Sequence, residues 1–333
     1  MSTSIDVLGI GNAIVDTLAR AEDDELHRAG LRKGAMQLVD EARAAEIYAG
    51  MGPTTVVSGG SAANTLTGVA GFGLSAAFIG KVKDDDAGRE FAHDIRSAGV
   101  AFDTPFASDG AATARCLVLV TPDGQRTMNT YLGACQALGP DDVDERLASA
   151  AKILYLEGYL WDPPAAKEAF LKAAKASRAA GRRVALSLSD AFCVDRYRGE
   201  FLQLVRDRLV DIVFANESEL HSLYETADFE TALRALAGEQ NLLGVVTRSE
   251  KGVVVVEGET KVAVPAYPVE QVVDTTGAGD LFAAGFLAGL ARGLPHAGSA
   301  SLGALAAAEI ISHVGARPQK DLLQLARDHG LFA

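Results

Sequence analysis

Short apolar runs alternate with helical segments along the second half of the chain. The runs typical of buried strands are Ile153–Leu156, Val184–Leu188, Ile212–Ala215 and Leu243–Thr247. Each is separated from the next by a segment with the composition and length of a helix. Strands that alternate with helices predict a parallel sheet covered by helices on both faces.

The helices of this half follow from the same pattern. We expect them at Pro164–Ala180, Asp195–Leu209 and Glu217–Tyr224, with a short helix before Leu243 and three more at 278–292, about 297–313 and 319–328. The helices at 278–292 and 297–313 are rich in Ala and Gly, which allows close packing on a sheet. Val253–Val256 and Val262–Val264, separated by Glu257-Gly258-Glu259, predict a hairpin.

The first 150 residues are less regular. The strands expected there are Ile5–Ile10, 13–20, Met36–Val39 and Ala76–Gly80, and the helices are Asp23–Ala29, 40–48, a small-residue helix that begins near residue 61, and one from Asp85 or Asp86 to Gly99. Two further β-rich runs, Thr113–Val120 and Arg126–Leu132, flank Thr121-Pro122-Asp123-Gly124-Gln125. Pro-Asp-Gly between apolar runs is typical of a turn, so this segment predicts a second hairpin.

The composition is typical of a globular protein, and the net charge disfavours some classes of binding partner. The 333 residues are 48% apolar, with 34 glycines and 10 prolines, and contain no repeat, low-complexity tract or linker. We therefore expect one α/β domain over residues 1–333 with a β-rich appendage. The formal net charge of −13 repels nucleic acid and anionic membranes, so neither is an expected partner.

Cysteine usage and the first residues indicate a compartment. Cys116, Cys135 and Cys193 lie far apart and form no CxxC pair, which is typical of reduced, partly buried thiols. The opening residues contain neither a basic region nor a long apolar region of a signal peptide, and no apolar run reaches membrane-spanning length. We expect a cytoplasmic protein.

Common nucleotide-binding and metal-binding motifs are absent. There is no G-x-x-x-x-G-K-[ST] sequence, and Gly9-Ile10-Gly11 has Ile14 where a dinucleotide fingerprint requires Gly or Ala. The six histidines are scattered without an H-E-x-x-H motif, and no protein-kinase motif occurs.

The stretch from Val272 to Phe282 contains the strongest candidate anion site. It reads as a strand end, a turn containing Gly277 and Gly279, and then a helix of small residues. The first N–H groups of a helix lack internal partners and attract anions, and glycine allows a ligand to approach them. Asp280 adds a carboxylate in the first turn, which suggests phosphoryl transfer to a hydroxyl. The alternative is that Asp280 only favours a helix N-terminus.

Polar residues near other strand ends extend this site. Asp16 and Asn64 each follow a glycine-marked strand end, where ligands of α/β sheets bind, and together they can hold vicinal hydroxyls. The alternative for Asn64 is a backbone or capping hydrogen bond. Asn216 and Glu219 suit Mg²⁺, directly or through water, and the alternative for them is a helix cap with first-turn acids.

Taken together, these residues resemble the ribokinase-like (PfkB) family of sugar and nucleoside kinases. The resemblance covers nearly the whole chain and includes two motifs, the glycine-rich region from Gly59 to Gly88 and Asp274-Thr275-Thr276-Gly277-Ala278-Gly279-Asp280. It implies a three-layer α/β/α fold with a mostly parallel central sheet. A small β-rich lid would come from segments of about 13–39 and 101–133.

The resemblance implies roles for the glycine turn and the lid. Asp280 would be the catalytic base that takes the proton from the acceptor hydroxyl. Gly277, Ala278 and Gly279 would form the anion hole for the transferring phosphoryl group. Arg126 on the lid hairpin would reach the phosphates on closure, and the alternative is an ordinary exposed arginine.

Further roles concern the ligands. The residues expected to hold the acceptor hydroxyls are Asp16, Gly60 and Asn64. Asn216 and Glu219 match the family's N-x-x-E motif, which organises Mg²⁺ and its waters. The residues matching the nucleotide-binding strand end are Thr247, Arg248 and Gly252, and the Ala-rich helix near 304–311 would line the adenine of ATP. Asp274 and Thr276 lie where many relatives hold K⁺, a point that the sequence leaves open.

Within the family, the adenosine kinase branch is most similar, through Gly11–Asp16, Leu186–Phe192 and Gly315-Ala316-Arg317. Apolar residues that would sandwich a purine, with the hydrophobic core as the alternative, are Met36, Leu38, Met128, Tyr131, Tyr159 and Phe192. The leading hypothesis is an ATP-dependent kinase of adenosine, followed by a ribokinase- or fructokinase-type sugar kinase. A nucleoside- or sugar-binding protein without catalysis is the remaining alternative. The family includes monomers and homodimers, so the oligomeric state stays open.

Overall fold

A nine-stranded sheet forms the centre of the larger part of the molecule, in a computed structural model that describes residues 5–332. In spatial order its strands are β14 (Thr260–Val264), β13 (Val253–Glu257), β12 (Leu243–Thr247), β11 (Ile212–Asn216), β10 (Arg183–Ser187), β9 (Ile153–Glu157), β1 (Val7–Ile10), β5 (Ala76–Ile79) and β6 (Val100–Phe102). All neighbours from β12 to β6 are parallel, and only the β12–β13–β14 edge is antiparallel.

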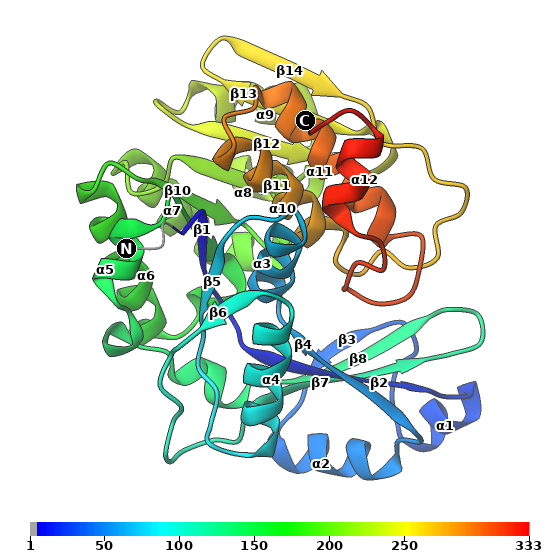
Figure 1. The fold of residues 1–333 in the computed structure, drawn as a ribbon. Coiled ribbons are helices and arrows are strands. Elements are labelled where there is room, and N and C mark those ends of the chain that lie inside the picture. The colour runs from blue at the N-terminus through cyan, green and yellow to red at the C-terminus, as the bar shows by residue number, and fades with distance from the viewer. Residues whose placement is uncertain (1–4, 333) are drawn as a thin grey trace.

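Helices cover both faces of this sheet. One hydrophobic cluster packs one face against α3 (Ser61–Gly71), α4 (Asp86–Ser97), α10 (Ala278–Ala291), α11 (His296–Ile310) and α12 (Leu322–Asp328). A second cluster packs the other face against α5 (Glu145–Ala150), α6 (Pro164–Ala179), α7 (Ala191–Arg206), α8 (Glu217–Tyr224) and α9 (Phe229–Gly238). The three-layer α/β/α arrangement expected from the alternating pattern is confirmed (Figure 1).

A smaller five-stranded sheet forms the lid, beside the carboxyl end of β1 (Figure 1). Its order is β3 (Met36–Leu38), β8 (Arg126–Tyr131), β7 (Ala114–Val120), β2 (Ile14–Arg20) and β4 (Thr54–Gly59). Helices α1 (Asp23–Arg28) and α2 (Glu41–Gly50) close its outer side with a third hydrophobic cluster. Strand residues alternate between faces, so one face packs on these helices and the other turns toward the body.

Register places a row of chemically distinct side chains on that inner face. Asp16 is paired with Cys116, Cys116 with Thr130, and Thr130 with Leu38. The adjacent row contains Met36, which is paired with Met128. The lid thus presents a carboxylate flanked by apolar side chains.

Several element boundaries differ from the expected ones. Strands β4 and β6 were not predicted; β4 adds a segment to the lid, whereas β6 belongs to the large sheet although it falls inside the expected lid segment 101–133. Helix α5 was also missed. Helix α7 begins at Ala191 rather than Asp195, because the side chain of Asp190 caps it by accepting from the Cys193 amide (2.6 Å).

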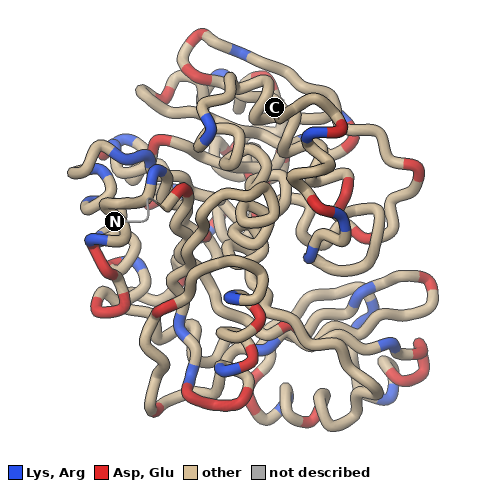
Figure 2. Tube along the Cα trace, in the orientation of Figure 1, with Lys and Arg blue, Asp and Glu red and all other residues tan. Residues whose placement is uncertain are grey.

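The surface agrees with the composition. Lys and Arg are interspersed with the more numerous Asp and Glu residues (Figure 2). Among residues 5–332, no helix is both long enough and apolar enough to cross a bilayer. Cys116, Cys135 and Cys193 are buried and unbridged, as expected.

Small residues allow α3, α10 and α11 to approach closely. A Cβ placed on Gly68 of α3 would lie 2.6 Å from the Ala284 Cβ of α10. A Cβ placed on Gly285 of α10 would lie 2.5 Å from the Leu302 carbonyl oxygen of α11. Contacts of this length are impossible for real atoms, so glycine is required at both helix crossings.

We expect Gly285→Ala to destabilise the protein by about 1–3 kcal/mol, because the backbone of α11 would have to move. Gly199→Ala is the matched control, since Gly199 lies within α7 and an added Cβ there would meet no atom within 4 Å. That variant should be more stable by about 0.5–1 kcal/mol. Denaturant unfolding of both variants measures the difference, and equal effects would contradict the packing argument.

Candidate active site

The glycine turn before α10 brings Asp280 to the edge of the large sheet next to the lid. Gly277 is the N-cap of α10 with φ 77°, a left-handed conformation that favours glycine. The Ala278 amide donates to the Thr275 carbonyl (3.2 Å), and the Leu281 amide to the Gly277 carbonyl (2.8 Å). The amides between them, of Gly279 and Asp280, belong to the helix positions that have no intrahelical acceptor. A Cβ on Gly279 would meet no atom within 4 Å, so the turn has space for an anion.

A second glycine turn, before α3, meets the first at Asp280. The Ser61 hydroxyl donates to Asp280 Oδ1 (2.6 Å), and Asn64 Nδ2 donates to Oδ2 (3.0 Å). Gly60 has φ 97°, and a Cβ there would lie 2.1 Å from the Asn12 carbonyl oxygen. The two predicted turns are therefore parts of one site, although they are more than 200 residues apart.

Asn64 has one acceptor to spare. The residue is 6% exposed, its Nδ2 is used by Asp280, and its Oδ1 is buried without a protein partner. A buried polar atom without a hydrogen bond is costly. A donor on a bound molecule, such as a hydroxyl group, would satisfy it.

Asp16 follows the end of β1 in the chain and lies within β2, which agrees with the strand expected at 13–20. It belongs to this site because it packs on the glycine turn: a Cβ on Gly59 would lie 2.3 Å from Asp16 Oδ2. Burial raises the pKa of Asp16 to about 7, against the lowering effect of Arg317 and Arg126 and with a further rise from Asp280.

The pKa of Asp280 is also shifted by its surroundings. Burial raises its pKa, while the hydrogen bonds from Ser61 and Asn64 and the charge of Arg317 lower it. A carboxylate with a raised pKa is a better proton acceptor than an exposed aspartate. This geometry fits a general base better than a plain first-turn acid.

Arg126 connects the lid to the loop before α10. Its Nη2 lies 3.0 Å from Asp274 Oδ2, and its side chain is 9% exposed, so the alternative of an ordinary exposed hairpin arginine is wrong. Asp274 also accepts from the Thr276 amide (3.0 Å) and the Gly315 amide (2.9 Å). Because both Asp274 oxygens are engaged, its side chain fits K⁺ poorly, and K⁺ binding there stays a prediction.

Asn216 and Glu219 form a reciprocal capping box at the start of α8. Asn216 Oδ1 accepts from the Glu219 amide (2.8 Å), and Glu219 Oε2 accepts from the Asn216 amide (3.0 Å). Burial, followed by the charge of Asp190, raises the pKa of Glu219 to about 7. The capping interpretation is therefore confirmed. Since these atoms are engaged with each other, the pair suits Mg²⁺ through water rather than by direct ligation.

The predicted nucleotide-binding residues lie at the end of β12 and in the turn that follows it. Arg248 forms a bidentate pair with Glu217 (3.0 and 3.1 Å) and lies 3.5 Å over the Phe229 ring. Gly252 is required by close backbone packing, since its Cβ would lie 2.2 Å from the Val264 carbonyl oxygen. Thr247 ends β12, and its hydroxyl lies 3.5 Å from the Ala215 carbonyl oxygen. In this structure Arg248 is committed to protein partners.

A cavity of about 480 Å³ lies between the loop before α10, α11 and α12. Its lining includes Val273, Leu305 and Ala308, so part of the predicted Ala-rich segment borders open space. Glu309 also lines it and is 4% exposed, with its Oε2 buried and unpartnered. The rest of the lining is mixed, with apolar residues beside polar and charged ones such as Glu270, Lys320 and His329. The cavity therefore offers both apolar contact and hydrogen-bonding groups to a planar base that carries an amino group.

Four of the apolar residues predicted to sandwich a purine are exposed. Met36 is 53%, Tyr159 42% and Phe192 67% exposed, so the alternative that they form core is wrong. Leu38, in the same lid row as Asp16, is 63% exposed. Tyr131, by contrast, packs on the α2 side of the lid and donates to Glu41 (3.0 Å), so its expected place beside a purine is wrong.

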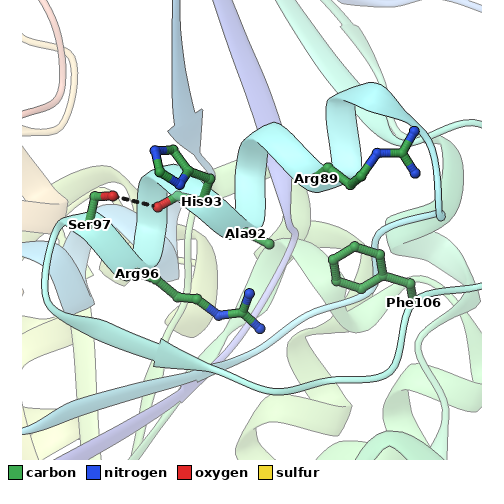
Figure 3. A pocket seen from close by; sticks show the side chains of 6 residues that line it. All are labelled: Arg89, Ala92, His93, Arg96, Ser97 and Phe106. Carbon is green, nitrogen blue, oxygen red and sulfur yellow. Dashed lines mark hydrogen bonds between the residues drawn. The ribbon is translucent and has the colours of Figure 1, made fainter.

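Another cavity of about 480 Å³ lies on α4, lined by Arg89, Ala92, His93, Arg96, Ser97 and Phe106 (Figure 3). None of the predicted site residues lines it. Arg89 is paired with Asp84 and Asp86, and Arg96 donates to the Phe102 carbonyl. The positive charge at this cavity is therefore largely engaged.

Three residues of the site were not predicted. Ser61 holds Asp280, and Glu157, buried at the end of β9, accepts from Asn12 Nδ2 (2.7 Å) and from the Ala62 amide (2.8 Å). Burial raises the pKa of Glu157 to about 7. Its signal was available, because it is the first polar residue after an apolar strand, as Asn216 is. Arg317 had been noted only as part of a motif.

Comparisons with known proteins identify the family of this chain. The family model described as pfkB family carbohydrate kinase matches residues 41–322. The structure of an adenosine kinase from Sinorhizobium meliloti is 52% identical, with a TM-score of 0.90, over 98% of this chain and 100% of that one. A probable sugar kinase from Rhizobium etli is 49% identical, with a TM-score of 0.92, over 99% and 100%. An ATP-dependent ribose-1-phosphate kinase from Halopiger xanaduensis is 33% identical over 69% of this chain and 72% of its own.

The chain belongs to the pfkB family of carbohydrate kinases. It is therefore a phosphotransferase that acts on a small sugar or nucleoside.

The raised pKa of Asp16 makes stability depend on pH. A carboxyl with a folded-state pKa of about 7, against 3.8 ordinarily, binds its proton more tightly in the folded protein. Folding is therefore favoured on the acid side, and this contribution is lost as pH rises toward 7. In Asp16→Asn, the fall in unfolding free energy between pH 5 and 6.5 should be shallower by up to about 1.4 kcal/mol per pH unit.

Denaturant unfolding at several pH values measures this slope. Asp123→Asn is the matched control, because the Lys33 side chain lowers the pKa of that exposed carboxyl to about 2, outside the pH window. Parallel curves for the parent protein and Asp16→Asn would contradict the assignment.

Proposed function

We propose that this enzyme is an adenosine kinase, which transfers the γ-phosphoryl group of ATP to adenosine and forms AMP. The observation that carries the proposal is the exposure of apolar side chains at the positions predicted to sandwich a purine. Met36 and Leu38 lie on the same lid face as the partly buried Asp16, and Tyr159 and Phe192 lie on the body. A free sugar has no surface that would cover them, whereas a purine offers two apolar faces. The similarity to the Sinorhizobium adenosine kinase supports the same acceptor.

The chemistry follows from the two glycine turns. Asp280 takes the proton from the attacking hydroxyl. Asp16 and the free Oδ1 of Asn64 bind vicinal hydroxyls of the acceptor and so hold it in position. The amides at the start of α10 stabilise the negative charge of the transferring phosphoryl group, and they need no reorganisation because the helix fixes them. Arg126 adds positive charge from the lid.

The donor nucleotide and its metal have complementary surroundings. The cavity beside Ala308 would hold the adenine of ATP, with Glu309 as acceptor for its amino group. Asn216 and Glu219 would hold Mg²⁺ through water, and the ion would neutralise phosphate charge. Within residues 5–332 no cluster of three or more His, Cys, Asp or Glu side chains that could hold a metal ion occurs.

A sugar kinase is the second candidate. Asp16, Gly60 and Asn64 recognise hydroxyls and would serve a free sugar equally well. The similarity to the probable sugar kinase of Rhizobium etli favours this candidate.

A coupled ADP-release assay with a panel of nucleosides and sugars separates the two candidates. We expect Mg²⁺-dependent turnover with adenosine, and Asp280→Asn should lower kcat by about 100- to 10,000-fold because an amide cannot take the proton. Asp86→Asn, at an exposed first-turn acid of α4, is the control and should keep full activity. Turnover with free sugars but with no nucleoside would contradict the proposal of a nucleoside acceptor.

The apolar side chains provide a second discriminating test. Phe192→Ala should raise the KM for adenosine by roughly 10-fold or more, the value of one base stack, with little change in kcat. Tyr48→Ala removes another exposed aromatic ring, on the other side of the lid, and should change neither constant. If Phe192→Ala leaves the KM for adenosine intact, this ring does not contact the base.

A further inference from the structure

Arg317, in the loop after α11, connects segments that are about 250 residues apart. Its guanidinium donates to the Thr67 hydroxyl of α3, to the Ser58 carbonyl oxygen of β4 and to the Ser58 hydroxyl (2.5 Å). Asp94 of α4 accepts from the Ser58 amide (2.7 Å) and lies 3.9 Å from Arg317 Nη2. The guanidinium thus donates to three acceptors on α3 and β4, and Asp94 adds a longer ion pair.

The loop that carries Arg317 is fixed to the turn before α10. The Gly315 amide donates to Asp274 Oδ2 (2.9 Å). Ala316 lies directly against Gly277, since a Cβ placed on this glycine would be 3.1 Å from the Ala316 Cβ. Arg317 therefore extends from the anion-binding turn to the glycine turn that holds Asn64.

The connection through Arg317 differs from the one through Asp280. Ser61 and Asn64 also join the two turns, but they do so through the carboxylate that would take up a proton during the reaction. Arg317 joins them through groups that do not react. It can preserve the spacing of the turns while the bonds at Asp280 change.

Arg317 also faces the negative charges of the site. Three carboxylates interact with it, from different elements: Asp16 of β2, Asp94 of α4 and Asp280 of α10. The other cation that acts on Asp16 is Arg126, which belongs to the lid and is paired with Asp274. Glu157 of β9 faces Asp280 as well, so the site concentrates negative charge around one body-anchored cation.

We propose that Arg317 is a positioning residue for the phosphotransfer, which fixes the glycine turn at 59–64 against the anion-binding turn and supplies a permanent positive charge to both Asp16 and Asp280. An arginine suits this role, because its planar fork reaches several acceptors and it stays charged at every working pH. In agreement, the charge of Arg317 lowers the pKa of each of the two carboxyls, against the effect of burial. The inference rests on the proposed role of Asp280 as base.

The pH dependence of kcat/KM tests this role, because it reports the groups of the free enzyme. With whichever acceptor the panel identifies, Arg317→Gln should move the acid limb of the profile upward by about one pH unit. Arg317→Lys keeps the charge but not the fork, so its acid limb should stay near that of the parent while the KM for the acceptor rises roughly 10-fold. Arg178→Gln, which removes a half-buried arginine paired with Asp211, is the control and should change neither.

Two results would overturn the proposal: an acid limb of Arg317→Gln that does not move, or an equal loss of activity at every pH, which a merely structural role would produce. If thermal unfolding shows that Arg317→Gln does not fold, the pH dependence of kcat/KM is measured on Asp94→Asn instead. Removing that negative charge should move the acid limb downward, and an unmoved limb overturns the proposal. Failure of the base assignment is seen separately, as normal activity of Asp280→Asn.

Discussion

Asp280 accepts two hydrogen bonds from the first turn of α3, one from Ser61 and one from Asn64. The rest of the site depends on this contact. It requires the amino ends of α3 and α10 to lie side by side, which only small residues along both helices allow. Gly68 of α3 faces Ala284 of α10 with no space for a Cβ. Gly285 of α10 likewise has no space for a Cβ, because it packs on the backbone of α11 at Leu302. Packing within one helical layer therefore determines the distance between Asp280, the proposed base, and Asn64, which we propose to bind the acceptor.

Much of the fold was predictable because buried parallel strands and their helices leave a strong local pattern. The expected bounds of β12 and α8 are those observed. Strand β4 was missed because it is polar and begins at an exposed edge, and β6 because it has only three residues. The start of α7 was misplaced because Asp190 and Asp195 are both plausible caps, and only the observed bond to Cys193 distinguishes them.

For the site, the sequence revealed turns but not the contacts between them. Gly60, Asn64, Gly277 and Asp280 were found because glycine turns before helices are local features. Arg317 was not assigned, since its partners are distant in the chain and nothing near it in sequence indicates a ligand. Glu157 was overlooked although it ends an apolar strand, because its partners Asn12 and Ala62 are also distant in the chain. The pairing of Arg126 with Asp274 likewise depends on how the lid lies against the body.

The short connection between β4 and α3 has a mechanical consequence. β4 is a strand of the lid, and a single residue, Gly60, separates it from the helix that carries Asn64. A short segment also separates β1 of the body from β2, which carries Asp16. Asp16 and Asn64, which we propose to bind acceptor hydroxyls, thus lie close to the connections between the lid and the body. Rotation of the lid about these connections would change the distance between Asp16 and Asn64. Closure of the lid and alignment of the acceptor would therefore be coupled.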